Sequence, residues 1–225
     1  TTVVFARSGP DARELRFPRN GLLIDSVRHE GKEAAFLLDD GRGALVIPLP
    51  PPHSSSPLPE RLVVTYHATP TQGLRFGDRF VYSDFFTCHW MVCSEEPGDK
   101  ATLHLEVIVP ASYTVVASGR LASQHMDASG QLHSRWAEER PYSPYLYGFA
   151  TGELIEVQVN EGSDTLRFLG VKGLESEESL HRKFQDTALM LRFLRSRAGI
   201  PLAGGAYTQV LLPGDEAQEK SSFSI

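Results

Sequence analysis

The chain has 225 residues, enough for one large domain or two modest ones. Its hydrophobic content of 41% and charged content of 22% are ordinary for a soluble globular protein. The formal net charge of −6 argues against a nucleic-acid-binding protein, which needs a clustered positive surface. No apolar run approaches the roughly 20 residues of a membrane span. The first residues do not begin with Met and show no secretory leader, so we expect a trimmed piece of a longer protein and assign no localisation.

Short alternating apolar runs punctuated by turns occupy residues 1–165 and predict β-strands. The sequence "DDGRG" between two apolar runs predicts a hairpin. The clearest alternation lies in residues 102–109, where one face carries Leu103, Leu105, Val107 and Val109 and the other carries Thr102, His104 and Glu106. The pattern predicts an antiparallel, sandwich-like β-domain.

The composition changes near residue 175, where "SEESLHRKFQDTALMLRFLRSRAGIP" predicts one helix. Ser176 is placed to cap its start, and Gly199 suits the position just after its end. An apolar stripe runs along this helix through Leu180, Phe184, Thr187, Leu191 and Leu194. Because the helix lies between the strand-like runs "LRFLGV" and "TQVLLP", it indicates the start of an α/β unit.

The two cysteines, Cys88 and Cys93, are too few for a disulfide scaffold. On one extended strand they would face opposite sides, roughly 16 Å apart, whereas a disulfide needs Cα atoms within about 7 Å. We therefore expect no bond between them unless the chain turns there. A zinc cluster with His89 is disfavoured, because there is one C-x4-C pair and no second pair.

Sequence signatures of other active sites are missing as well. There is no HExxH, no G-x-S-x-G, no P-loop and no dinucleotide fingerprint. The serines of "HSSSP" are explained by a Pro/Ser loop rather than by a nucleophile. The residues by themselves predict no catalytic group and no metal ligand in this chain.

The segment "HWMVCSEEPGDKATLHLEVIVP" resembles the N-terminal domain of zinc aminopeptidases of the aminopeptidase N (membrane alanyl aminopeptidase) family. The positions that match the family's motif are Trp90, Cys93, Glu95, Glu96, Pro97, Lys100, Ala101, Thr102 and Pro110. Further segments, "LVVTYHATPTQGLRF", "VVASGRL", "PYSPYLYGFATGEL" and "YTQVLLPG", resemble the family in the same order along the chain. The family's usual first strands are expected before Thr1.

The resemblance implies a saddle-shaped β-sandwich at residues 1–158, followed at 159–225 by the opening α/β segment of a thermolysin-like catalytic domain, cut off before the zinc motif. It implies a parent enzyme that removes N-terminal residues from peptides. In that family zinc polarises the scissile carbonyl, a glutamate activates water, and a further carboxylate holds the free α-amine of the peptide. This chain is then expected to be catalytically incompetent alone, with no cofactor of its own.

The sequence departs from the family at both of its amine-binding positions. The exopeptidase segment "G-A-M-E-N" is replaced by "EAQEKSSFSI", in which Glu219 is the candidate substrate-binding carboxylate. The family's amine-binding Gln would fall at Val81, counting back twelve residues from Cys93, and valine cannot bind an amine. The alternative hypothesis is therefore a non-catalytic, β-rich interaction module on an aminopeptidase-like scaffold. The apolar helix stripe also predicts either a homo-oligomer or a tight internal contact.

Overall fold

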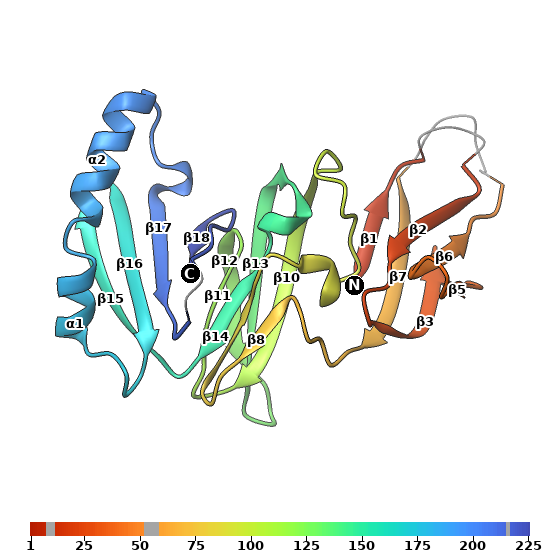
Figure 1. Cartoon of the computed structure of the whole chain (residues 1–225), viewed down its shortest axis with the longest axis horizontal. Helices are drawn as coiled ribbons and strands as arrows, with labels where there is room; N and C mark the ends of the chain where they lie inside the picture. The colour runs from red at the N-terminus through yellow and green to blue at the C-terminus, as the bar shows by residue number, and fades with distance from the viewer. Residues whose placement is uncertain (8–11, 52–58, 215–216) are drawn as a thin grey trace. The chain divides into compact units, whose positions relative to one another are not determined.

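The computed structural model describes residues 1–7, 12–51, 59–214 and 217–225. The "HSSSP" segment therefore lies outside the described residues. The chain forms two compact units: residues 1–74 with 86–99 are unit 1, and residues 75–85 with 100–225 are unit 2. Figure 1 traces the elements of both units in chain order.

Unit 1 is a sandwich of two antiparallel sheets. One sheet has the order β1 (Thr2–Phe5), β7 (Glu60–His67), β3 (Leu23–His29) and β4 (Lys32–Glu33), and the other β2 (Glu14–Pro18), β6 (Ala44–Pro48) and β5 (Leu37–Asp39). Both sheets supply buried side chains to one core, including Val27 and Val64 from the first and Phe17 and Ile47 from the second. The "DDGRG" hairpin is confirmed as the β5–β6 connection.

The cysteine segment turns instead of continuing as a strand. Residues Thr87–His89 form a 3₁₀ turn, which brings the Cα atoms of Cys88 and Cys93 to 5.2 Å, and their sulfur atoms are joined in a disulfide. The expected extended strand with two unbonded thiols was wrong: the chain turns here, which is the one condition under which a bond was expected. Val92 inside this loop packs into the core of unit 1, so the disulfide closes a loop that is already anchored by burial.

Unit 2 contains two antiparallel sheets packed face to face. The first is β10 (Ala101–Pro110), β13 (Gln131–Tyr142) and β12 (Arg120–Met126); the second is β11 (Thr114–Ala117), β14 (Phe149–Gly152), β9 (Phe80–Ser83) and β8 (Leu74–Phe76). The alternation in residues 102–109 is confirmed: Leu103 and Val109 are buried, while Thr102, His104 and Glu106 are exposed. Short 3₁₀ turns lie at Pro144–Leu146 and Ala203–Gly205.

A third sheet of unit 2 has the order β15 (Leu154–Glu161), β16 (Asp164–Val171), β17 (Ala206–Leu211) and β18 (Phe223–Ser224). The β16–β17 and β17–β18 pairs are parallel, as an α/β unit requires. Two helices connect β16 to β17 and cover one face of this sheet (Figure 1): α1 (Glu177–Lys183) and α2 (Thr187–Ala198). The other face shares a core with the β11–β14–β9 sheet.

The single helix expected from the sequence is thus two. Its ends are as predicted, since the Ser176 side chain accepts a hydrogen bond from the Ser179 amide and Gly199 adopts a left-handed φ of 69°. The predicted stripe was right in part: Leu180, Phe184 and Leu191 pack on the sheet, whereas Leu194 is exposed.

These antiparallel sheets confirm the mainly β fold class. Within the described part of the chain, no helix is long and apolar enough to cross a membrane. A domain boundary at residue 158 stays a prediction.

Candidate functional site

The candidate substrate-binding segment folds as a tight hairpin at the edge of the third sheet. The amides and carbonyls of Gln218 and Ile225 bond to each other at 2.9 Å in both directions, and the Lys220 amide donates to the Phe223 carbonyl at 2.8 Å. Successive side chains in such a hairpin point to opposite faces. Gln218 and Lys220 are buried and Glu219 between them is exposed.

Lys220 is a buried amine, with 5% of its surface exposed. Its Nζ donates a hydrogen bond to the backbone oxygen of Asp84 at 2.8 Å. With the Gln218 amide oriented to satisfy both of its ends, its oxygen accepts from Lys220 Nζ at 3.1 Å and from the Phe85 amide at 2.9 Å. Burial disfavours the charged ammonium and lowers the pKa of Lys220 to about 7, although the nearby Asp84 charge opposes this shift.

Asp84 lies directly after β9 and is also buried, with 2% of its surface exposed. Its Oδ2 lies 3.0 Å from Nε of Arg75, and the partner arginine is about half exposed. A buried carboxylate needs such a partner, because an isolated charge is strongly disfavoured in a low-dielectric environment. Asp84 is therefore already paired with a cation of its own chain, Arg75.

Close backbone packing fixes this arrangement. A Cβ on Gly148 would lie 2.2 Å from Ser83 Oγ and 2.7 Å from Lys220 Cε, so only glycine fits there. The Ser83 hydroxyl accepts a hydrogen bond from the Phe149 amide at 2.9 Å. The start of β14, the end of β9 and the hairpin are consequently held in contact at one point.

Glu219 lies on the open side of the hairpin. Its carboxylate accepts a hydrogen bond from the Tyr207 hydroxyl at 3.1 Å, and the same hydroxyl lies 3.2 Å from Ser224 Oγ. Burial is the main cause of the raised pKa of Tyr207, which therefore remains protonated and a donor at neutral pH. The pair offers an exposed carboxylate whose orientation is fixed by β17, and an exposed carboxylate can accept an ammonium group.

The two segments in which the sequence places its candidate groups meet in the structure, but the sequence did not single out Asp84 or Lys220. Glu219 is in the hairpin, and the predicted role for it stays a prediction. Val81 lies within β9 opposite Thr151, while the backbone oxygen of Asp84, three residues later, accepts the hydrogen bond from Lys220 of the hairpin. A lysine in a polar run is normally exposed to solvent. The burial of Lys220 could therefore have been suspected only from the strand alternation that puts it on the same face as Gln218.

The described residues do not fit a zinc ion. Among the residues that the structure describes, no group of three His, Cys, Asp or Glu side chains could hold a metal. The sulfur atoms of Cys88 and Cys93 are bonded to each other and so cannot serve as thiolate ligands.

No protein-family model matches the sequence, and no curated protein matches it either. Solved structures do match over the whole chain. The M1 zinc metallopeptidase from Deinococcus radiodurans has a TM-score of 0.82 at 23% identity, covering 100% of this chain and 54% of that one. A mutant of that enzyme bound to a Tyr-Ser-Ala substrate matches with a TM-score of 0.82 at 22% identity, covering 100% of this chain and 55% of that one.

A two-domain M1 zinc metallopeptidase mutant bound to L-arginine matches with a TM-score of 0.83 at 23% identity, covering 100% of this chain and 54% of that one. The chain therefore has the fold found in the corresponding part of M1 zinc metallopeptidases. It spans about half the length of the solved structures that it matches.

Proposed function

We propose that this chain is the N-terminal part of a zinc metallo-aminopeptidase-like protein that removes N-terminal residues from peptides. The observation that supports this most is the likeness over the entire chain to M1 zinc metallopeptidases, one of them bound to a peptide substrate. On this proposal residues 1–158 form the N-terminal β-domain and residues 159–225 open the catalytic domain. The chain alone is then not a peptidase, and zinc, supplied with its ligands by the rest of the parent, would activate the attacking water.

Glu219 is the side chain of this chain that we propose to bind the substrate. Its carboxylate is exposed, and the Tyr207 hydroxyl holds it by a hydrogen bond. A carboxylate at a fixed place on a sheet edge would hold the free α-amine of a peptide and so restrict cleavage to its first residue. The role of this chain is then to orient the substrate rather than to carry out the chemistry.

The test is performed on the full-length gene product, by measuring zinc content and the hydrolysis of a panel of aminoacyl-arylamides. We expect stoichiometric zinc and turnover, and we expect Glu219→Gln to lower kcat/KM by about tenfold or more, because a charged hydrogen bond to the substrate is lost. Glu178→Gln, at an exposed position on α1, is the matched control and leaves kcat/KM unchanged. Absence of both zinc and turnover overturns the proposal.

A second candidate function is a non-catalytic interaction module on the same scaffold. It is favoured by the state of Asp84, whose buried carboxylate is paired with Arg75 and lies close to Lys220, and is thus not free for a substrate amine. Full-length protein that folds, contains no zinc and cleaves no arylamide would favour this function. An unchanged kcat/KM in Glu219→Gln, with turnover present, would instead mean an aminopeptidase that anchors the amine elsewhere.

A further inference from the structure

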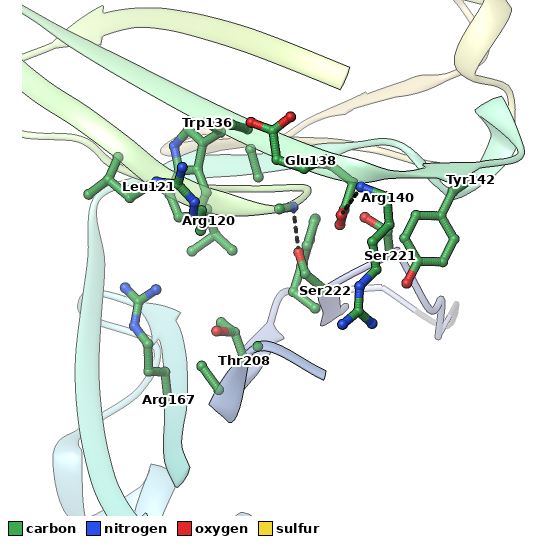
Figure 2. Close-up of a pocket in the computed structure, with 18 residues that line it drawn as sticks. Arg120, Leu121, Trp136, Glu138, Arg140, Tyr142, Arg167, Thr208, Ser221 and Ser222 are labelled. Carbon is green, nitrogen blue, oxygen red and sulfur yellow. Dashed lines mark hydrogen bonds between the residues drawn. The ribbon is translucent and has the colours of Figure 1, made fainter. Parts of the chain in front are cut away.

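The paired strands β12 and β13 have a cavity beside the start of β12 and a charged cluster at the turn that joins them. The cavity, of ≈ 370 Å³, lies between these strands and the β16–β17 pair (Figure 2). Its charged lining residues are Arg120, Arg140, Arg167, Glu138 and Glu139. Glu156 pairs with Arg167 at 2.7 Å, so three cations stand against three carboxylates (3 − 3) and the lining selects neither an anion nor a cation. The cluster at the turn differs, because one titratable ring lies between two acids.

That ring is the imidazole of His133 on β13, which bridges two other elements. Its Nδ1 is 3.2 Å from Oε1 of Glu106 on β10, and its Nε2 is 3.3 Å from Oδ2 of Asp127 in the turn between β12 and β13. A neutral imidazole has one N–H and one lone pair, so it can donate to only one of these carboxylates. Imidazolium donates from both nitrogens. Both contacts are therefore hydrogen bonds only while His133 is protonated.

The two carboxylates stay ionised where the imidazole titrates. Asp127 Oδ1 accepts from the Gln131 amide at 2.8 Å and from the Ser129 amide and hydroxyl at 2.9 and 2.8 Å. Such bonds, with that from Gln131 first, lower the pKa of Asp127 to about 2. The hydrogen bond with His133 lowers the pKa of Glu106, and the two carboxylates, Glu106 first, raise the pKa of His133 above its ordinary 6.5. His133 is thus the member of this bridge that changes charge near neutral pH.

An arginine on the same strand and a histidine on β12 also surround the bridge. Arg135 Nε lies 3.1 Å from Glu106 Oε1, so Glu106 keeps a cation when His133 loses its proton. Among the residues that the structure describes, Asp127 forms an ion pair with His133 alone. His125 lies opposite His133 with the ring centroids 4.8 Å apart, and charge on both rings at once would be repulsive. Deprotonation of His133 therefore weakens chiefly its bond to the turn.

We propose that His133 is a pH-sensitive clamp that fixes the β12–β13 turn to β10. While it is protonated, its imidazolium holds Glu106 and Asp127 together. After the proton is lost, Glu106 retains Arg135 and the turn at residues 127–130 is released. The clamp contributes stability that is complete below about pH 6.5 and is lost as pH rises through the raised pKa of folded His133. The clamp involves neither zinc nor Glu219, so its test is independent of the proposed peptidase function.

The test follows the ring nitrogens of His133 by NMR in the isotope-labelled 225-residue chain, from about pH 5 to about pH 9. We expect a titration midpoint above 6.5. The backbone order parameters of residues 127–130, which report motion on the picosecond-to-nanosecond timescale, should fall across the same midpoint. His133→Gln cannot form an imidazolium, so it should have the lower order parameters at every pH.

Glu106→Gln and Asp127→Asn should each lower the His133 midpoint by about 0.5 or more on the pH scale, because each removes one negative partner. The double variant should bring it to 6.5 or below. Glu139→Gln is the matched control, since Glu139 lies roughly 20 Å further along β13, pairs with His104 at 3.5 Å and should leave the midpoint unchanged.

A His133 midpoint at or below 6.5 in the parent chain overturns the proposal. The same midpoint in the double variant as in the parent does so too, because the carboxylates would then have no effect on the ring. Order parameters of residues 127–130 that stay constant while His133 titrates would show that the turn is not held by this histidine.

Discussion

Lys220 Nζ donates a hydrogen bond to the backbone oxygen of Asp84, a residue 136 positions earlier, at 2.8 Å. This bond ties the C-terminal hairpin to the end of β9. The two segments that it joins, around Val81 and Glu219, are those in which the resemblance to aminopeptidases predicts the amine-binding groups. In this chain the contact is made by a lysine and a paired aspartate, so an internal amine occupies the surroundings of Asp84.

The stability of unit 2 should rise with pH because of Lys220. Its pKa is about 7 in the folded chain and 10.5 in the unfolded one. Between these values the unfolded chain binds a proton that the folded chain does not, so the free energy of unfolding increases as pH rises, by up to roughly 1.4 kcal/mol per pH unit. Urea unfolding from about pH 7 to about pH 9, followed by Trp136 fluorescence in Trp90→Phe, measures this rise.

Lys220→Met should remove most of that pH dependence, and Lys100→Met, at an exposed position, should retain it. The Thr1 amine also has a pKa lowered by burial, but it lies in unit 1 and is present in every variant. The same slope in Lys220→Met and the parent would show that Lys220 is charged in the folded protein at neutral pH.

The disulfide should stabilise unit 1 selectively. The bond between Cys88 and Cys93 closes a loop of few residues, and loop-closure entropy then gives about 2 kcal/mol. We expect the double variant Cys88→Ser with Cys93→Ser to lower the stability of unit 1 by this amount, as reported by Trp90 in a Trp136→Phe background. In a Trp90→Phe background, where Trp136 is the sole tryptophan and reports on unit 2, the double variant should leave the measured stability unchanged. A fall in both reports would mean that the two units unfold together.

Tyr147→Phe should destabilise unit 2 although it removes a single oxygen. The Tyr147 side chain is 1% exposed, and its hydroxyl donates to the Ala101 carbonyl and accepts from the Tyr142 amide. Removing it leaves two backbone groups without this partner, which costs about 1–3 kcal/mol. Tyr145→Phe, at a tyrosine that is 46% exposed, is the control and should have no measurable effect on denaturant unfolding.

Replacing Leu180 by alanine should lower the free energy of unfolding much more than replacing Leu189. Leu180 is fully buried against the third sheet, so its truncation should cost about 2–5 kcal/mol. Leu189 is 60% exposed on α2, and its truncation should change stability by about 0.5 kcal/mol at most. Equal costs would indicate that the outer face of α2 is covered in solution, as in the predicted homo-oligomer, and sedimentation of the parent chain would then reveal it.

Local pattern was enough for much of the fold. The alternation of Leu103 to Val109, the "DDGRG" turn, the Ser176 cap and the Gly199 end are all set by residues within a few positions of one another, so they are legible in the sequence. The break between α1 and α2 was not, because Leu180, Phe184 and Leu191 would share one face of an unbroken helix as well, so the apolar pattern carries no sign of a bend.

The sequence by itself determined the mainly β architecture, the α/β end of the chain and the likeness to aminopeptidases. Only the tertiary structure decided that Cys88 and Cys93 are bonded, that Lys220 is buried beside Asp84, and that His133 lies between two carboxylates. The physical reason is common to all three. Each depends on the distance between side chains whose positions are set by turns or by contacts between distant strands, and a one-dimensional pattern carries no such distance.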